Sequence, residues 1–296
     1  MKKTIFTGAG VAIVTPFNPD MSVNYNKLAE LIDWQIANET DAIVICGTTG
    51  ESSALSLEEH EEVVKFAIDH VAGRVPVVAS SGSNDTAAAV QLSKSAKAAG
   101  ADALLMVTPY YNKTTQVGIV KHYEKVASEV DLPIIVYNVP GRTGFGIKPE
   151  TYVELAKIPT VTAVKEANGD ISAIAKTIAL CGDSLDIYSG NDDMIVPMMA
   201  LGAKGVISVL SNVMPKETHD ICQLFFDGKY KESADLQLKL IHLCDALFCE
   251  VNPMPVKAAM NMMGLDVGIP RLPLCDVTDA SKAKIKEALL KEGLIK

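Results

Sequence analysis

The chain has 296 residues, of which 48% are hydrophobic and 21% are charged, and its formal net charge is −9. This is an ordinary globular composition with enough apolar residues for a large core, in one large domain or two small ones. The acidic balance argues against a nucleic-acid partner, and no apolar run approaches membrane-spanning length, so we expect a cytoplasmic protein that binds neither nucleic acid nor membrane.

Short apolar runs rich in β-branched residues recur at intervals of roughly 20–35 residues and alternate with helical patterns, as in a parallel sheet built of βαβ units. Several runs are apolar nearly throughout, which is typical of strands covered on both faces. The eight runs are Gly10–Val14, Ala42–Cys46, Val75–Ala79, Ala103–Val107, Pro133–Tyr137, Val161–Val164, Leu185–Tyr188 and Gly205–Val209. They predict a (β/α)8 TIM barrel of the α/β class. The alternative is an open doubly wound sheet, but Gly8-Ala9-Gly10 lacks the third glycine of its nucleotide-binding turn.

Helix signals lie between the runs. Ser56 is an N-cap candidate with acids in the following turn, and the alanine-rich segment Asp85–Ala99 ends at Gly100, a natural C-cap. His60 stands among four glutamates, so we expect it on a solvated helix face.

From about Lys216 onward the pattern is helical only. The helical segments are Asp220–Phe226, Lys231–Phe248, Val256–Met263 and Ser281–Leu290. We therefore predict a barrel that carries the active site over residues 1–228 and a C-terminal helical region over residues 229–296.

The cysteines and histidines do not have metal-binding spacing. The six cysteines include no C-x-x-C pair, and the five histidines include no H-E-x-x-H motif. We expect buried or half-buried thiols in a reducing compartment, and no metal.

Lys165 directly follows the run Val161–Val164, at the end of a strand where the active groups of such barrels lie. Burial against an apolar wall disfavours the ammonium form, and a neutral amine can form a Schiff base with a ketone. A lone lysine at this place is more simply interpreted as a side chain that reaches solvent. A catalytic role for Lys165 therefore depends on which residues lie at the other strand ends.

Other strand ends carry hydroxyl groups, glycines and a guanidinium. They are Gly47-Thr48-Thr49-Gly50-Glu51, Tyr110-Tyr111, the segment from Tyr137 to Gly144 with Arg142, and Ser189-Gly190-Asn191-Asp192. Each alone could be a tight turn, a core aromatic or a surface charge. Together they suit one chemistry, in which a lysine imine yields an enamine, hydroxyls move protons, loop N–H groups bind one carboxylate and an arginine binds a second.

The Gly47–Glu51 loop, Tyr137–Gly144 and Val164–Asp170 together resemble the signatures of the dihydrodipicolinate synthase (4-hydroxy-tetrahydrodipicolinate synthase) family of pyruvate-dependent class I aldolases, and the likeness covers the whole chain. The resemblance implies a lyase that condenses pyruvate with L-aspartate 4-semialdehyde in the diaminopimelate route to lysine, without a metal or organic cofactor. It implies the following roles: Lys165 as the Schiff-base lysine, Tyr137, Thr48 and Tyr111 as the proton relay, and Thr49, Arg142, Gly190 and Ile207 in substrate binding.

The resemblance also implies a homotetramer built as a dimer of dimers, in which Tyr111 reaches the site of the neighbouring subunit. Relatives that are inhibited by lysine bind it in a cleft at the tight-dimer interface, at positions that match Ser53, Leu57, His60, Asn84, Ala88 and Tyr110. This chain has Ala88 where those relatives place a carboxylate, and Leu57 where some place a histidine. A buried ammonium without its partner is costly, so we predict weak or absent inhibition by lysine.

Two alternatives stay open. N-acetylneuraminate lyase and the 2-keto-3-deoxy sugar-acid aldolases share the lysine, the tyrosine and the glycine-threonine loop, but Arg142 argues against them because a sugar would favour other groups there. The second alternative is a catalytically inactive barrel. The complete set of chemically active groups at the strand ends argues against it.

Overall fold

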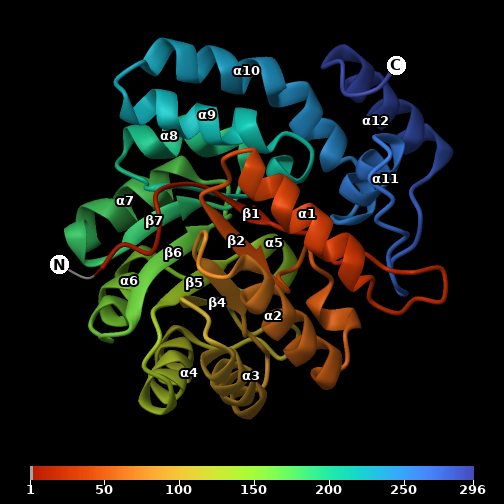
Figure 1. Cartoon of the computed structure of the whole chain (residues 1–296). Coiled ribbons are helices and arrows are strands. Elements are labelled where there is room, and N and C mark those ends of the chain that lie inside the picture. The colour runs from red at the N-terminus through yellow and green to blue at the C-terminus, as the bar shows by residue number, and fades with distance from the viewer. Residues whose placement is uncertain (1–2) are drawn as a thin grey trace.

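The computed structural model describes residues 3–296, so residues 1 and 2 of the predicted barrel region lie outside it. Eight parallel strands close into a barrel in chain order, β8 pairs with β1, and helices surround the barrel (Figure 1). The strands are β1 (Gly8–Ala12), β2 (Ala42–Ile45), β3 (Val77–Ser80), β4 (Ala103–Val107), β5 (Ile134–Asn138), β6 (Val161–Glu166), β7 (Asp186–Ser189) and β8 (Gly205–Ser208). The predicted TIM barrel is confirmed.

The observed strand bounds equal the predicted ones at β4 and differ from them by one or two residues in the other strands. β1 begins at Gly8 rather than Gly10, and β6 continues to Glu166. Lys165 therefore lies within the last two residues of a strand, at the strand end where it was expected. The reason is its pairing on both sides, with Tyr137 of β5 and Tyr188 of β7, which keeps this polar residue in the sheet.

The outer layer consists of helices that follow the strands. They are α1 (Tyr25–Ala37), α2 (Leu57–Val71), α3 (Thr86–Ala99), α4 (Gln116–Glu129), α5 (Pro140–Thr143), α6 (Pro149–Ala156), α7 (Ile171–Cys181), α8 (Ile195–Ala200) and α9 (Pro215–Phe226). Short 3₁₀ turns occur at η1 (Ser52–Ala54), η2 (Gly182–Ser184), η3 (Asp192–Met194) and η4 (Leu210–Asn212). As predicted, Ser56 caps α2, in a capping box with Glu59, and Gly100 ends α3 with a φ of 96°.

The prediction that His60 faces solvent is wrong. The side chain lies on the buried face of α2 with Val63, Val64 and Ala67, and burial lowers the pKa of His60 to about 4. The cysteine prediction is wrong at one position, because Cys275 is exposed, while the other five thiols are buried or half-buried as expected.

The C-terminal helices are α10 (Tyr230–Leu247), α11 (Met254–Met262) and α12 (Asp279–Lys291), and α10 lies on the outer side of α9 (Figure 1). α10 packs on α9, and α12 packs on both α10 and α11. Over residues 3–296, no helix combines the length and the apolar character that a membrane span requires.

The barrel interior is filled by its own small apolar core. Phe6 stacks on Tyr188 at a centroid distance of 4.4 Å, and the Tyr188 hydroxyl donates to the Phe6 carbonyl at 2.6 Å. This contact closes the end of the barrel where the strands begin. The opposite end, where the strands finish, is left for the site.

Candidate active site

A cavity of about 90 Å³ opens at the carboxyl ends of the strands. Its lining includes six of the eight residues that were predicted for the site: Thr48, Thr49, Tyr137, Arg142, Lys165 and Gly190. A second hollow of about 210 Å³ meets it at Thr48, Tyr137 and Arg142 and extends to Tyr110. The strand-end groups thus converge on one place, as the barrel geometry predicts.

Lys165 is the central group of this cavity. The residue is only 6% exposed, and its Nζ lies 4.4 Å from the centroid of the Tyr137 ring. Burial lowers the pKa of Lys165 to about 8; the charge of Asp192 opposes this shift, and that of Arg142 adds to it. The amine can therefore be neutral for a useful fraction of the time near neutral pH.

Two residues with hydroxyl groups share this cavity with Lys165. Tyr137 on β5 and Thr48 from the loop after β2 both line it. Burial raises the pKa of Tyr137, whereas the positive charge of Arg142 and the Thr48 hydroxyl act in the opposite direction. The two hydroxyls form a short path along which a proton can move.

Two further predicted residues are tied to the C-terminal region by Asn252. Thr49 is buried, and its Oγ1 accepts a hydrogen bond from Asn252 Nδ2 at 2.9 Å. Arg142 on α5 is exposed at the cavity mouth, and its Nη2 donates to the backbone oxygen of Asn252 at 3.1 Å. One residue therefore links the groups expected to bind two carboxylates.

Gly190 makes room for the lysine side chain. A Cβ at this position would lie 3.2 Å from Cε of Lys165 and 2.7 Å from Cβ of Ala167. A larger residue here would push the amine out of place, which gives Gly190 a steric reason to be glycine.

Residues 5–292 match the Dihydrodipicolinate synthetase family. The chain belongs to this family. It is 54% identical, over 99% of its length and the whole length of the relative, to the 4-hydroxy-tetrahydrodipicolinate synthase of Clostridium tetani. The family and the enzyme class predicted from the sequence, a Schiff-base-forming lyase, are thereby confirmed.

Solved structures of dihydrodipicolinate synthases have the same fold. The crystal structure of the Thermotoga maritima protein has a TM-score of 0.96 at 40% identity and covers 99% of this chain and 100% of that one. The chloride-inhibited protein of Acinetobacter baumannii, complexed with pyruvate, has a TM-score of 0.96 at 42% identity with the same coverage.

Two predicted residues of this dihydrodipicolinate synthetase family member do not reach the cavity within the described chain. Tyr111 is 92% exposed and has a φ of 65°. Ile207 on β8 belongs to the apolar core inside the barrel, and Val209, two residues further on, lines the cavity instead. Ile207 therefore supports the cavity floor, whereas Tyr111 points to solvent in the single chain.

The sequence reasoning assigned no role to two residues at the site. Asp192 is buried in η3 and acts on the pKa of Lys165; its place just after the strand end Ser189-Gly190 was a usable signal. Asn252 lies between α10 and α11, and nothing in its local sequence indicates that it contacts Thr49.

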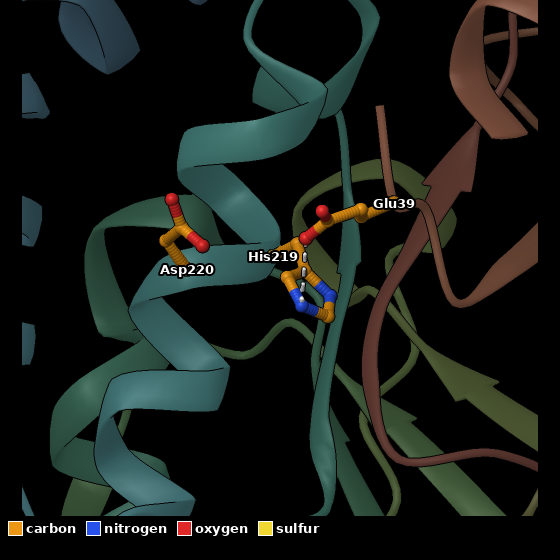
Figure 2. A group of neighbouring side chains, drawn as sticks. All are labelled: Glu39, His219 and Asp220. Atoms are coloured by element: carbon orange, nitrogen blue, oxygen red, sulfur yellow. Dashed lines mark ion pairs between the residues drawn. The ribbon is translucent and has the colours of Figure 1, made fainter. Parts of the chain in front are cut away.

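A cluster that could hold a metal lies at the opposite end of the barrel, where the strands begin. Figure 2 shows Glu39 and His219 facing each other beside α9, with Asp220 next along that helix. The ammonium of Lys216 lies 2.9 Å from Glu39 Oε2 and 2.5 Å from Asp220 Oδ1. Because a cation of the chain already neutralises both carboxylates, we assign no metal to this cluster.

Proposed function

We propose that this chain catalyses the reaction for which its curated relatives are named, the condensation of pyruvate with L-aspartate 4-semialdehyde by 4-hydroxy-tetrahydrodipicolinate synthase. The observation that carries the proposal is the buried amine of Lys165, with its pKa lowered to about 8, in a cavity shared with Tyr137 and Thr48. No metal or organic cofactor is needed, because the imine itself is the electron sink.

The reaction begins when the neutral Nζ of Lys165 attacks C2 of pyruvate. The carbinolamine then loses its hydroxyl as water, which requires a proton from the Tyr137–Thr48 pair, and an imine forms. Loss of a proton from C3 to the Tyr137–Thr48 pair gives an enamine, and its C3 attacks the aldehyde carbon of the second substrate while the aldehyde oxygen takes up that proton. The amino group of the second substrate then attacks C2 of the resulting imine, which closes the ring and releases Lys165 as the free amine. The shared cavity of Tyr137, Thr48 and Lys165 supports these proton transfers, because both hydroxyl groups can accept and donate a proton there.

The carboxylates of the two substrates bind on different sides of Lys165. We place the pyruvate carboxylate at Thr49 and the backbone N–H groups of its loop. The carboxylate of the aldehyde substrate binds Arg142 at the exposed mouth, where a guanidinium can donate two hydrogen bonds. Gly190 leaves room for the imine, and Ile207 supports the floor.

The assembly is part of the proposal. A tyrosine that is 92% exposed, in a left-handed backbone conformation that bulky residues rarely adopt, is better explained by a contact with a second subunit. We propose a cytoplasmic homotetramer, a dimer of dimers, in which Tyr111 extends the proton relay of the neighbouring site. Residues 1–228 form the barrel, and residues 229–296 form a helical region that adds Asn252 to the site.

The test is covalent trapping followed by an assay. The protein is treated with pyruvate and borohydride and analysed by mass spectrometry, then assayed with aspartate semialdehyde and a reductase that consumes the product. We expect a pyruvate adduct on Lys165 and nearly complete loss of turnover in Lys165→Ala, while the exposed-lysine control Lys176→Ala keeps both. Absence of an adduct on folded protein would indicate an inactive barrel, and a higher kcat/KM with a sugar-derived aldehyde would indicate a sugar-acid aldolase.

A further inference from the structure

The loop that carries Thr48 and Thr49 is bounded by two residues in an unfavourable backbone conformation. Cys46 before the loop has a φ of 53°, and Glu51 after it has a φ of 55°. Residues other than glycine rarely adopt this left-handed region, and they stay there only when surrounding contacts fix them. The contacts of Glu51 therefore decide how well the loop is held.

Glu51 is held by the C-terminal region through both oxygens of its carboxylate. Oε1 accepts a hydrogen bond from Lys257 Nζ on α11 at 2.8 Å, and Oε2 accepts one from the backbone N–H of Arg271 at 2.8 Å. The side chains of Glu51 and Lys257 are 1% and 0% exposed. This is a fully buried ion pair that joins segments more than two hundred residues apart in the chain.

Lys257 also holds the loop by a second route. Its Nζ donates to the backbone oxygen of Thr15 at 3.0 Å, and the Thr15 hydroxyl donates to the backbone oxygen of Gly50 at 2.6 Å. The same ammonium lies 4.2 Å from the centroid of the Phe17 ring. One buried amine thus fixes both Glu51 and, through Thr15, the preceding residue of the loop.

We propose that Lys257 and Glu51 are positioning residues for the pyruvate-binding loop. The pair keeps Glu51 in its left-handed conformation and so sets where Thr48 and Thr49 meet the substrate. Over the described chain the cavity lining contains Thr48 and Thr49 but neither member of the pair, so the pair acts through the loop. The inference rests on the proposed function, because it takes pyruvate as the ligand of that loop.

A role in stability alone is the competing explanation. A buried ion pair often contributes little compared with apolar groups of the same volume, whereas loss of one partner leaves an unpaired buried charge. Single and paired replacements therefore separate the two roles. Lys257→Met alone leaves the Glu51 carboxylate buried without its ammonium partner. Lys257→Met combined with Glu51→Gln removes both charges at nearly constant volume.

The experiment measures thermal unfolding, kinetic constants for both substrates and the rate of borohydride trapping with pyruvate. We expect the double variant to recover stability relative to Lys257→Met but to keep a KM for pyruvate raised about tenfold or more, since small displacements of binding groups have effects of this size. The KM for the aldehyde substrate, which Arg142 binds, should stay within about twofold. Val126→Ala, a cavity variant in the buried face of α4, is the control for lost stability and should leave the KM for pyruvate unchanged.

Recovery of the pyruvate KM together with stability in the double variant would overturn the proposal. If the charge variants do not fold, Thr15→Val distinguishes loop positioning from a role in stability alone, because it removes only the hydroxyl that holds Gly50. A pyruvate KM raised about threefold or more supports positioning, and an unchanged KM overturns it. If the unaltered protein traps no pyruvate, it is the proposed function that fails, and this outcome is seen before any variant is compared.

Discussion

Replacing Asp192 by asparagine removes the one charge that favours the ammonium form of Lys165 and leaves the local fold in place. Oδ2 of Asp192 accepts two hydrogen bonds from backbone N–H groups, that of Val209 at 3.0 Å and that of Leu210 at 2.9 Å. Because a single oxygen takes both bonds, the amide oxygen of asparagine can keep them. The charge of Asp192 is the second-largest influence on the pKa of Lys165, after burial.

The size of the effect follows from the fraction of neutral amine. With a pKa of about 8, about one tenth of Lys165 is neutral at pH 7, compared with about one in 2,500 for an ordinary lysine. A close opposite charge shifts a pKa by about one unit or more. Loss of a one-unit contribution, equal to about 1.4 kcal/mol, makes about half of the amine neutral at pH 7. Imine formation in Asp192→Asn should then be about fivefold faster at pH 7 and unchanged near pH 9.5, where both amines are already neutral.

The assay follows the initial rate of pyruvate adduct formation on Lys165, with borohydride quenching and mass spectrometry, between about pH 6 and pH 10 at subsaturating pyruvate. We expect the inflection of the unaltered protein near pH 8 and that of Asp192→Asn at lower pH. Asp193→Asn, at the exposed neighbouring position, is the control, and its rate of adduct formation should have the same pH dependence as that of the unaltered protein. An inflection that stays in place or moves to higher pH in Asp192→Asn would refute the reasoning, because burial would then act without an opposing charge.

Three further predictions concern the aldehyde substrate, stability and regulation. Arg142→Ala should raise the KM for aspartate semialdehyde about tenfold or more in the coupled assay, while pyruvate trapping changes far less. Tyr152→Phe should cost about 1.5–3 kcal/mol of unfolding free energy at pH 8.5 in urea denaturation, because its hydroxyl donates to the Glu166 carboxylate at 2.6 Å; Tyr123→Phe, whose hydroxyl donates to a neutral carbonyl at 2.7 Å, should cost about 1 kcal/mol. Lysine at millimolar concentration should leave turnover nearly unchanged, because Ala88 offers the ligand's ammonium no carboxylate; a substantial fall in kcat would contradict this.

The barrel and most of the site could be predicted from the sequence because both follow from local patterns and one topological rule. Apolar runs of strand length indicate the parallel sheet, and closure of that sheet brings the strand ends together. Lys165, Tyr137 and the Thr48-Thr49 loop are far apart in the chain but follow strands of one barrel, so their meeting needed no knowledge of side-chain packing.

Contacts from outside the strand ends could not be predicted in this way. Asn252 and Lys257 reach the loop of Thr49 and Glu51 from the helical region, and no periodicity or motif near them indicates a partner some two hundred residues away. His60 is a different case, because a signal was present. Its spacing of three, four and seven residues to Val63, Val64 and Ala67 predicts a buried helix face, and this outweighs the neighbouring glutamates.

The pairing of β5 with β6 also connects the ionisation of Tyr137, which lines the cavity, with that of Glu166, which does not. Lys165 pairs with Tyr137 and Glu166 pairs with Asn138, so alternation along the strands puts the first pair inside the barrel and the second outside. There the Glu166 carboxylate accepts from Asn138 Nδ2 at 2.8 Å, and burial raises the pKa of Glu166 to about 7. The charge of Glu166 in turn raises the pKa of Tyr137. Above pH 7, therefore, the ionised Glu166 carboxylate helps Tyr137 keep its proton over the pH range in which Lys165 loses its own. A protonated Tyr137 beside a neutral Lys165 is the combination that imine formation requires.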